Sequence, residues 1–322
     1  MPHSKTLKAA VLIALLAAWL PALSQEKFPS RPIEIIVPTP PGGGTDAVAR
    51  QLGDLVEPIL GQKVIVSNRP GGGGMIGMAA VTQARPDGYT LGGLWPGPIT
   101  MTPHMQAAPY TPEDYTTIVL ADISPGILCV KPEMAAANAR ELIELIRKNP
   151  NKFTYGNDGV GGMMHLSTER IFSRLGLKAR AVPFGGAGET LKNFLGGHVD
   201  IYSGSITPIL PYVKAGTAKC VLLTSKEKSD IVPLASSLAE LGIPESAMNM
   251  WHGIVGPKGI PAERLAILQR AFTQAAKSDK FRELAVASGA IPVAQDGAQF
   301  RKHIDGESVA MHELMKSLGL AK

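Results

Sequence analysis

PIEIIVPTPPGGGTDAVARQLG, residues 32–53, is the stretch from which the fold of this chain can be worked out. Residues 33–37 form a short, β-branched apolar run that stops at prolines, which is typical of a buried strand. A glycine-rich loop follows, and then Thr45, a good N-cap residue, precedes a helical pattern with Val48 and Leu52 on one face. Such a loop turns several backbone N–H groups toward the positive end of the helix dipole. The stretch therefore predicts an anion-binding loop, and both phosphate and carboxylate fit it.

The same order of strand, loop and helix recurs along the chain. Further strands of this kind are predicted at residues 63–67, 153–156, 179–182 and 199–202. The last of them leads into a helix that is expected to start near Pro208, and another helix is well marked from Ala137 with Asn138 as its cap. Strands that alternate with helices predict a largely parallel α/β architecture.

The middle and the end of the chain show how these units are joined. Residues 118–121 and 126–130 are two extended runs separated by Asp-Ile-Ser-Pro, where the chain could pass between domains. An extended run at 251–256 precedes three amphipathic helices at the end of the chain. A length of 322 residues with 45% hydrophobic residues is enough for two domains, each with its own core.

The first 24 residues have the pattern of a targeting segment. A basic stretch, 1–8, is followed by an apolar stretch, 9–20, and by Pro21, and Ala22-Leu23-Ser24 offers small residues to a signal peptidase. The apolar stretch is shorter than the roughly 20 residues that a membrane span needs. We therefore expect cleavage near Ser24 and a soluble protein exported to the periplasm.

Charge and cysteine content limit the function classes. The formal net charge is +5, of which Lys5 and Lys8 in the targeting segment contribute two, and the remaining basic residues are scattered, so no nucleic-acid partner is expected. Cys129 and Cys220 are the only cysteines. They could pair in an exported chain, but buried free thiols in neighbouring strands are the favoured interpretation.

The sequence also contains weak marks of an enzyme. Gly72, Gly74 and Gly77 match G-x-G-x-x-G after a strand, but the next strand, residues 89–94, ends without the carboxylate that a dinucleotide site requires. These glycines are instead expected to let a helix dock closely. No nucleophile elbow surrounds the serines of the chain and no H-E-x-x-H motif occurs, so no catalytic residue, metal or cofactor is expected.

Several longer segments, taken in order, resemble one known family. They are RPIEIIVPTPPGGGTDAVAR, QKVIVSNRPGGGGMIG, ARPDGYTLGG, ELIELIRKNPNKFTYGNDGVGGMMHL, VPFGGAGETLKNFLGGHVDI and WHGIVGPKGIPAERLAILQRAF. Their order and spacing resemble the Bug receptors, the exported substrate-binding components of tripartite tricarboxylate transport systems. The resemblance covers nearly the whole mature chain.

The resemblance implies a two-lobed periplasmic-binding-protein fold of type II, the Venus-flytrap fold, with a mixed, mostly parallel sheet in each lobe. Lobe one would comprise residues 25–125 and 245–322, and lobe two residues 126–244, with crossings near Ser124 and Asn249. The lobes would close around a ligand by a hinge motion. The resemblance further implies a monomer that delivers its ligand to a membrane permease.

The family's ligand-binding loops can be carried over onto this sequence. In the family they present backbone N–H groups and small hydroxyls to ligand carboxylates, partly through ordered water. The implied substrate-binding residues are Thr39, Gly43, Gly44, Thr45, Asp46, Trp95, Pro96, Gly97, Asn157, Gly161, His165, Phe184, Gly185, Gly186, Ala187, Ser203 and Ser205. The charge of Asp46 would repel an acid, so we expect Asp46 to orient its loop or to accept a hydrogen bond from a ligand amine or hydroxyl.

Two loops differ from the common family pattern. Phe184-Gly185 stands where many relatives have Tyr-Lys, and Trp95 with nearby prolines and glycines replaces a loop often rich in Ser and Thr. Both changes make the predicted cleft less polar, which favours an aromatic or bulky mono- or dicarboxylate such as a terephthalate-like acid. The alternatives are a sensor component for the same acids and a nucleotide-binding enzyme.

Overall fold

The computed structural model describes residues 27–321, and the predicted targeting segment with its cleavage site lies outside the described residues. Residues 31–321 belong to one compact unit. Within the described part of the chain, none of the helices combines the length and the apolar character that crossing a bilayer requires.

The opening stretch folds as a strand, a loop and a helix. Strand β1, Ile33–Val37, is almost wholly buried, and helix α2 spans Gly44–Leu60. The prediction of Thr45 as N-cap is wrong by two residues, because Gly43 has the extended cap conformation and Thr45 lies inside the first turn, buried. Strand β2, Val64–Asn68, then pairs with β1 in parallel.

The remaining strands extend one mixed sheet. Its order is β2-β1-β3-β9-β4-β7-β5-β6, and both β8 and β10 also pair with β4. The bounds are β3 Thr90–Leu94, β4 Tyr115–Val130, β5 Thr154–Asn157, β6 Arg180–Pro183, β7 Ile201–Ser205, β8 Lys219–Leu223, β9 Asn249–Pro257 and β10 Ile291–Asp296. Parallel pairs form the two flanks, whereas every pair made by β4 or β9 is antiparallel. The sheet is therefore mixed, and less parallel than the alternation of strands and helices predicts.

Strand β4 is the element that links the two flanks. The prediction of two separate extended runs is wrong here, because Tyr115–Val130 is one continuous strand. Its first part pairs with β9 as far as Pro125 opposite Asn249, and its last part, from Gly126, pairs with β7. The predicted crossings near Ser124 and Asn249 lie at this change of partner, and the lobe limits stay a prediction.

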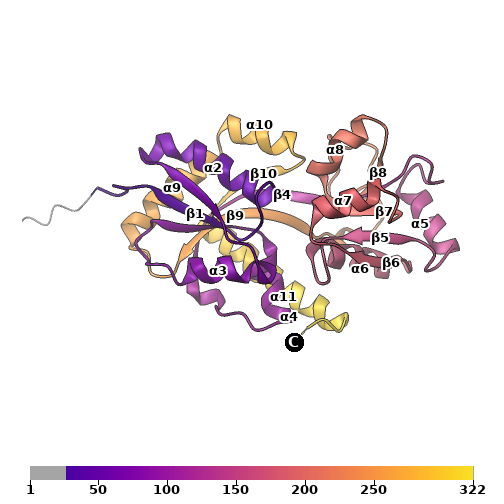
Figure 1. The fold of residues 1–322 in the computed structure, drawn as a ribbon, viewed down its shortest axis with the longest axis horizontal. Helices are drawn as coiled ribbons and strands as arrows, with labels where there is room; N and C mark the ends of the chain where they lie inside the picture. The colour runs from indigo at the N-terminus through magenta and orange to yellow at the C-terminus, as the bar shows by residue number, and fades with distance from the viewer. Residues whose placement is uncertain (1–26, 322) are drawn as a thin grey trace, which may run out of the picture. The chain divides into compact units, whose positions relative to one another are not determined.

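The helices gather around the two flanks of the sheet. Figure 1 shows α5 to α8 with β5 to β8 at one end, and α2, α3, α4, α9 and α11 around β1 and β9 at the other, with β4 and β9 running between. The bounds are α3 Met75–Thr82, α4 Thr102–Met105, α5 Ala139–Lys148, α6 Met163–Arg174, α7 Ala187–Leu195, α8 Ile206–Lys214, α9 Ala262–Ala276, α10 Asp279–Ala287 and α11 Gly297–Ser317. Asn138 caps α5 as predicted, since its side chain accepts the backbone N–H of Glu141.

A methionine-rich cluster packs between elements of both flanks. Met101, which follows β3, is buried with Met163 of α6 and with Met311 and Met315 of α11. Because methionine is unbranched and adaptable, such a contact tolerates repacking better than one made of branched side chains.

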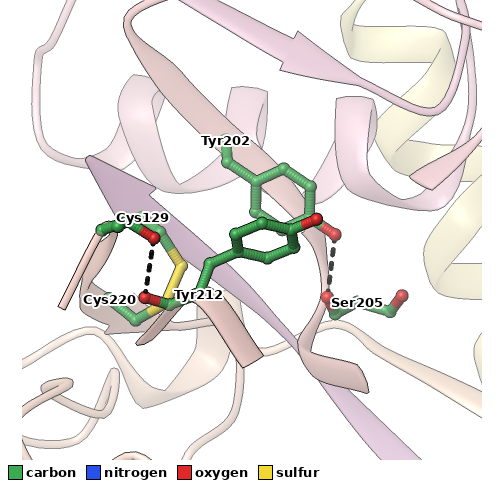
Figure 2. Close-up of a disulfide and its surroundings, with 6 residues drawn as sticks. Cys129, Tyr202, Ser205, Tyr212 and Cys220 are labelled. Carbon is green, nitrogen blue, oxygen red and sulfur yellow. Dashed lines mark hydrogen bonds between the residues drawn. A yellow bond between two sulfur atoms is a disulfide. The ribbon is translucent and has the colours of Figure 1, made fainter. Parts of the chain in front are cut away.

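The two cysteines correct the sequence prediction of free thiols. Cys129 of β4 and Cys220 of β8 are bonded to each other, with their Cα atoms 3.9 Å apart (Figure 2). They are register partners in the antiparallel pair β4–β8, which brings the two side chains together on one face of the sheet. Both belong to a buried cluster that also contains Tyr202.

Candidate functional site

The loop after β1 is organised by Asp46. Its carboxylate accepts the backbone N–H of Gly42 at 3.0 Å and the side-chain amide of Asn68 at 2.9 Å. Arg50, one turn along α2, donates to both carboxylate oxygens at 2.9 and 3.1 Å. The amide of Asn68 also donates to the carbonyl of Thr39, which ties the start of the loop to the same network.

These bonds decide the charge state of Asp46. Burial by itself raises the pKa of the carboxyl, but the hydrogen bonds from Arg50, Gly42 and Asn68 and the Arg50 charge outweigh burial, so the pKa lies below its usual value of 3.8. Asp46 is thus ionised and neutralised by Arg50. It orients the loop, which is the first of the two roles that the sequence suggested.

Trp95 lies packed between two glycine-rich loops. A Cβ added at Gly74 would be 2.6 Å from Cη2 of the indole, and one added at Gly97 would be 2.5 Å from its Nε1. Gly77 is equally close to a different residue, because a Cβ added there would be 2.7 Å from Cβ of Pro38. Gly74 and Gly77 thus allow close docking, as the sequence predicted, whereas a Cβ at Gly72 would meet nothing closer than Met75, at 3.6 Å.

The loop after β5 is held by its own side chains. Asn157 is fully buried and its Oδ1 accepts the N–H of Gly159 at 3.0 Å. His165, in the first turn of α6, accepts the N–H of Gly161 on Nδ1 at 3.1 Å. Asp158 accepts the N–H groups of Met164 and His165 on Oδ1, at 3.1 and 3.3 Å, and so caps α6.

The loops after β6 and β7 lie against this one. Phe184 donates its N–H to the carbonyl of Asn157 at 3.0 Å, and the Ser203 hydroxyl forms a buried 2.7 Å bond with Thr168 of α6. Ser205 is the N-cap residue of α8, but its side chain makes no capping bond. Helix α8 begins at Ile206, two residues before the start predicted from the sequence.

Two atoms among the predicted site residues are buried polar groups without a partner. They are Oγ1 of Thr39, at the end of β1, and Nδ2 of Asn157, at the end of β5. Buried polar groups are almost always hydrogen-bonded, so unpaired ones point to a bound ligand or water. Gly43, the N-cap residue of α2, has an extended backbone and no side chain with which to cap the helix.

The structure brings together the loops of each flank, and contacts besides the methionine-rich cluster also join the two flanks. A Cβ at Gly161, after β5, would overlap Sδ of Met105 in α4, so these two loops touch. Two cavities among the described residues, of about 680 and 510 Å³, are lined by none of the predicted site residues.

Sequence reasoning missed two features of this region. Asp158 sits inside the loop 157–165 but was not singled out, although an acid among glycines at a helix start is a readable signal. His252 of β9 was also missed. Its Nδ1 lies 2.7 Å from Oδ1 of buried Asp122 of β4, and a Cβ added at Gly44 would be 3.4 Å from its Nε2.

Among residues 27–321, no group of three or more His, Cys, Asp or Glu side chains could hold a metal ion.

The two-flanked mixed α/β sheet carries glycine-rich loops at the ends of β1 and β5. The model for the tripartite tricarboxylate transporter family receptor matches residues 48–320, and the chain belongs to this family. Protein BugT of Bordetella pertussis is 31% identical over 289 residues, which cover 88% of this chain and 88% of BugT. The resemblance noted from the sequence is thereby confirmed.

Solved structures agree with this assignment. The periplasmic binding protein BugD superposes with a TM-score of 0.81 at 28% identity, covering 92% of this chain and 100% of BugD. An R. palustris protein, Rpa4515, solved with adipate, gives a TM-score of 0.83 at 25% identity, covering 91% of this chain and 99% of that protein. The fold is therefore the two-lobed periplasmic-binding-protein fold.

Proposed function

We propose that this protein is an exported, monomeric receptor that captures a small carboxylate in the periplasm and delivers it to the membrane permease of a tripartite tricarboxylate transport system, without catalysis. The family supports the receptor role, and the adipate bound to Rpa4515 supports the ligand class. The observation that carries the proposal is the pair of unpartnered buried polar atoms, Thr39 Oγ1 and Asn157 Nδ2, at the ends of β1 and β5.

A carboxylate suits the first of these loops. The N-cap residue Gly43 gives α2 no side-chain cap, and Thr39 of the same loop has a buried hydroxyl without a partner. Desolvating a carboxylate is costly unless several donors receive it, and a helix N-terminus supplies such donors. Asp46 does not oppose the ligand, because Arg50 neutralises it.

The identity of the acid is proposed more narrowly from two aromatic side chains. Trp95 and Phe184 are both only partly buried and both belong to predicted site loops. They favour an aromatic or bulky mono- or dicarboxylate, of which terephthalate is an example, over a short polar diacid. A Trp95→Ala variant that binds an aromatic acid as tightly as the parent would remove this part of the proposal.

The direct test uses Asn157. Replacing it with Ala removes the free Nδ2, so the dissociation constant for the best carboxylate is expected to rise at least tenfold, about 1.4 kcal/mol. Asn193→Ala on the surface of α7 is the matched control and should leave the affinity unchanged. Equal affinity in both variants would contradict the proposed site.

Delivery to a permease needs its own test, since a sensor would bind the same acids. Pull-down from membrane extract with and without ligand identifies the integral protein that the liganded form retains. Recovery of a permease supports the proposed role in transport. Recovery of a membrane kinase would instead support a role as a sensor component.

A further inference from the structure

The cavity of about 680 Å³ lies where the two flanks of the sheet meet. Its wall includes one face of α11, Asn249 at the point where β4 changes partner, and Arg170 of α6. A volume of this size falls within the range of roughly 300–1,000 Å³ that is usual for small-molecule sites. The wall shares no residue with the loops of the proposed carboxylate site, so the cavity is a separate place on the molecule.

Gly306 leaves part of this cavity empty. It lies in the middle of α11, where glycine is a poor helix former. A Cβ added at Gly306 would have nothing within 4 Å, and its backbone is not left-handed, so neither packing nor conformation requires glycine there. Because Gly306 belongs to the wall, a larger side chain at this position would occupy space that is now open to a ligand.

Two cations in the wall have no carboxylate partner. Arg170 is half-buried and donates to the main-chain carbonyl of Glu245, whereas the carboxylate of Glu245 bonds to Arg174. Within residues 27–321, neither Arg170 nor Lys302 forms an ion pair. Burial lowers the pKa of Arg170 below its usual value, and the charge of Glu245 offsets this only in part. A guanidinium in this state gains from an anion that accepts its free N–H groups.

The one acid among the lining residues, Glu307, adds a donor instead of a repelling charge. Its Oε2 accepts the indole N–H of Trp251 and the hydroxyl of Thr100, both at 2.8 Å. Burial raises the pKa of this carboxyl to about 7, so the protonated form is well populated at neutral pH. The proton resides on Oε1, because Oε2 already accepts two hydrogen bonds and Oε1 has no partner among the described residues. An anion in the cavity favours this neutral form further.

Two buried polar atoms of the wall residues also lack a hydrogen bond. They are Oδ1 of Asn249 and Nε2 of His303. Burial lowers the pKa of His303, so this ring is neutral at pH 7 and the charge of the wall comes from Arg170 and Lys302. Buried polar groups are almost always paired, so two unpaired ones in one wall indicate that the cavity holds a polar ligand or water.

We infer that this cavity is a second binding site, for a small oxyanion of carboxylate or phosphate chemistry, held by Arg170 and Lys302 with neutral Glu307 as a further donor. Since α6 belongs to one flank of the sheet and α11 packs on the other, the bound anion contacts both. The inference goes beyond the proposed function and does not depend on it.

Calorimetric titration of the mature chain at pH 7 with inorganic phosphate and with citrate tests the inference. The loops are first saturated with the best carboxylate of the panel, or the ligand-free chain is used if none binds, so failure of the proposed function leaves this test intact. At least one probe is expected to bind with a dissociation constant below about 1 mM, and binding of only one of them fixes the chemistry of the site. Absence of binding by both probes up to about 10 mM overturns the inference.

A pair of arginine variants tests the charge. Arg170→Met is expected to weaken binding of the probe by about tenfold, because it removes the half-buried cation. Arg174→Met is the matched control, since Arg174 lies one turn further along α6, also bonds to Glu245 and does not line the cavity. It should bind the probe within about twofold of the parent.

A pair of glycine variants tests the location without changing any charge. Gly306→Leu should occupy part of the cavity and weaken binding of the probe by about tenfold, whereas Gly306→Ala adds one methyl group and should stay within about threefold of the parent. Unchanged affinity in either Arg170→Met or Gly306→Leu overturns the inference. If Gly306→Leu does not fold, Lys302→Met replaces it, with Lys316→Met on the same helix but outside the wall as its control.

Discussion

Glu307 of α11 accepts the indole N–H of Trp251 at 2.8 Å, and the same oxygen accepts the hydroxyl of Thr100 at 2.8 Å. Trp251 lies on β9, which links the two flanks, and Thr100 lies in the turn that follows β3 and Trp95. One buried carboxyl group thus fixes the C-terminal helix to the linking strand and to a predicted ligand loop.

Burial of Glu307 predicts a pH dependence of stability. Burial raises the pKa of this carboxyl from 4.5 to about 7, although the bonds from Trp251 and Thr100 lower it. Between pH 4.5 and 7 the folded state holds a proton on Glu307 that the unfolded state has lost. The protonated group therefore contributes on the order of 3 kcal/mol to the free energy of unfolding below pH 4.5, and this contribution is lost as the pH rises through 7. The stability of the parent relative to Glu307→Gln should fall over this range in urea unfolding. Glu313→Gln, at an exposed position on α11, should show no such trend, and a flat difference for Glu307→Gln would contradict the assignment.

The disulfide predicts a large loss of stability on reduction. Cys129 and Cys220 are 91 residues apart, and closing a loop of this length lowers the chain entropy of the unfolded state by about 4–5 kcal/mol. The double variant Cys129→Ala, Cys220→Ala should lose a stability of this order in urea unfolding, and dithiothreitol should destabilise the parent but not the variant. Equal midpoints for oxidised parent and variant would show that the bond contributes little.

Much of the fold is predictable from local signals, because each is satisfied within a few residues. The run 33–37 and the Asn138 cap of α5 are of this kind. What sequence reasoning missed depends on distant partners. Strand β10 carries Pro292 and a register shift, and only its pairing with β4 makes it a strand. The cysteines pair because β8 lies beside β4 in a particular register.

The candidate site, too, is only partly predictable from local sequence signals. Glycine-rich loops at strand ends are visible in the sequence, and the structure places them at the ends of β1, β2 and β5. Whether a loop is open or filled is not visible, because it depends on side-chain direction. Asp46 and Asp158 look alike in sequence, but one is paired with Arg50 and the other caps α6 with no cationic partner within residues 27–321.

Gly74 tests the packing of Trp95. Gly74→Ala places a Cβ 2.6 Å from the indole at a backbone φ of 94°, so a loss of roughly 2–4 kcal/mol is expected in urea unfolding from strain and overpacking together. Gly216→Ala is the control, because its φ is 71° but nothing lies within 4 Å of the added atom. Equal losses in the two variants would mean that the indole gives way without cost.

Arg50 tests whether the loop after β1 must be neutral to accept an acid. Arg50→Met leaves Asp46 ionised without its partner, and the affinity for a carboxylate should fall about tenfold by repulsion. Arg69→Met removes a more exposed ion pair, with Glu34, and should bind as the parent does. Calorimetric titration with the best acid measures both, and an unchanged affinity in Arg50→Met would place the ligand carboxylate elsewhere.

The most direct test of the account is thermal stabilisation of mature 25–322 by a panel of aliphatic, amino and aromatic carboxylates together with NAD, since a ligand that binds only the folded state raises the melting temperature. The account predicts a rise with carboxylates, largest for one class, and none with NAD. A rise with NAD and none with any acid would contradict it.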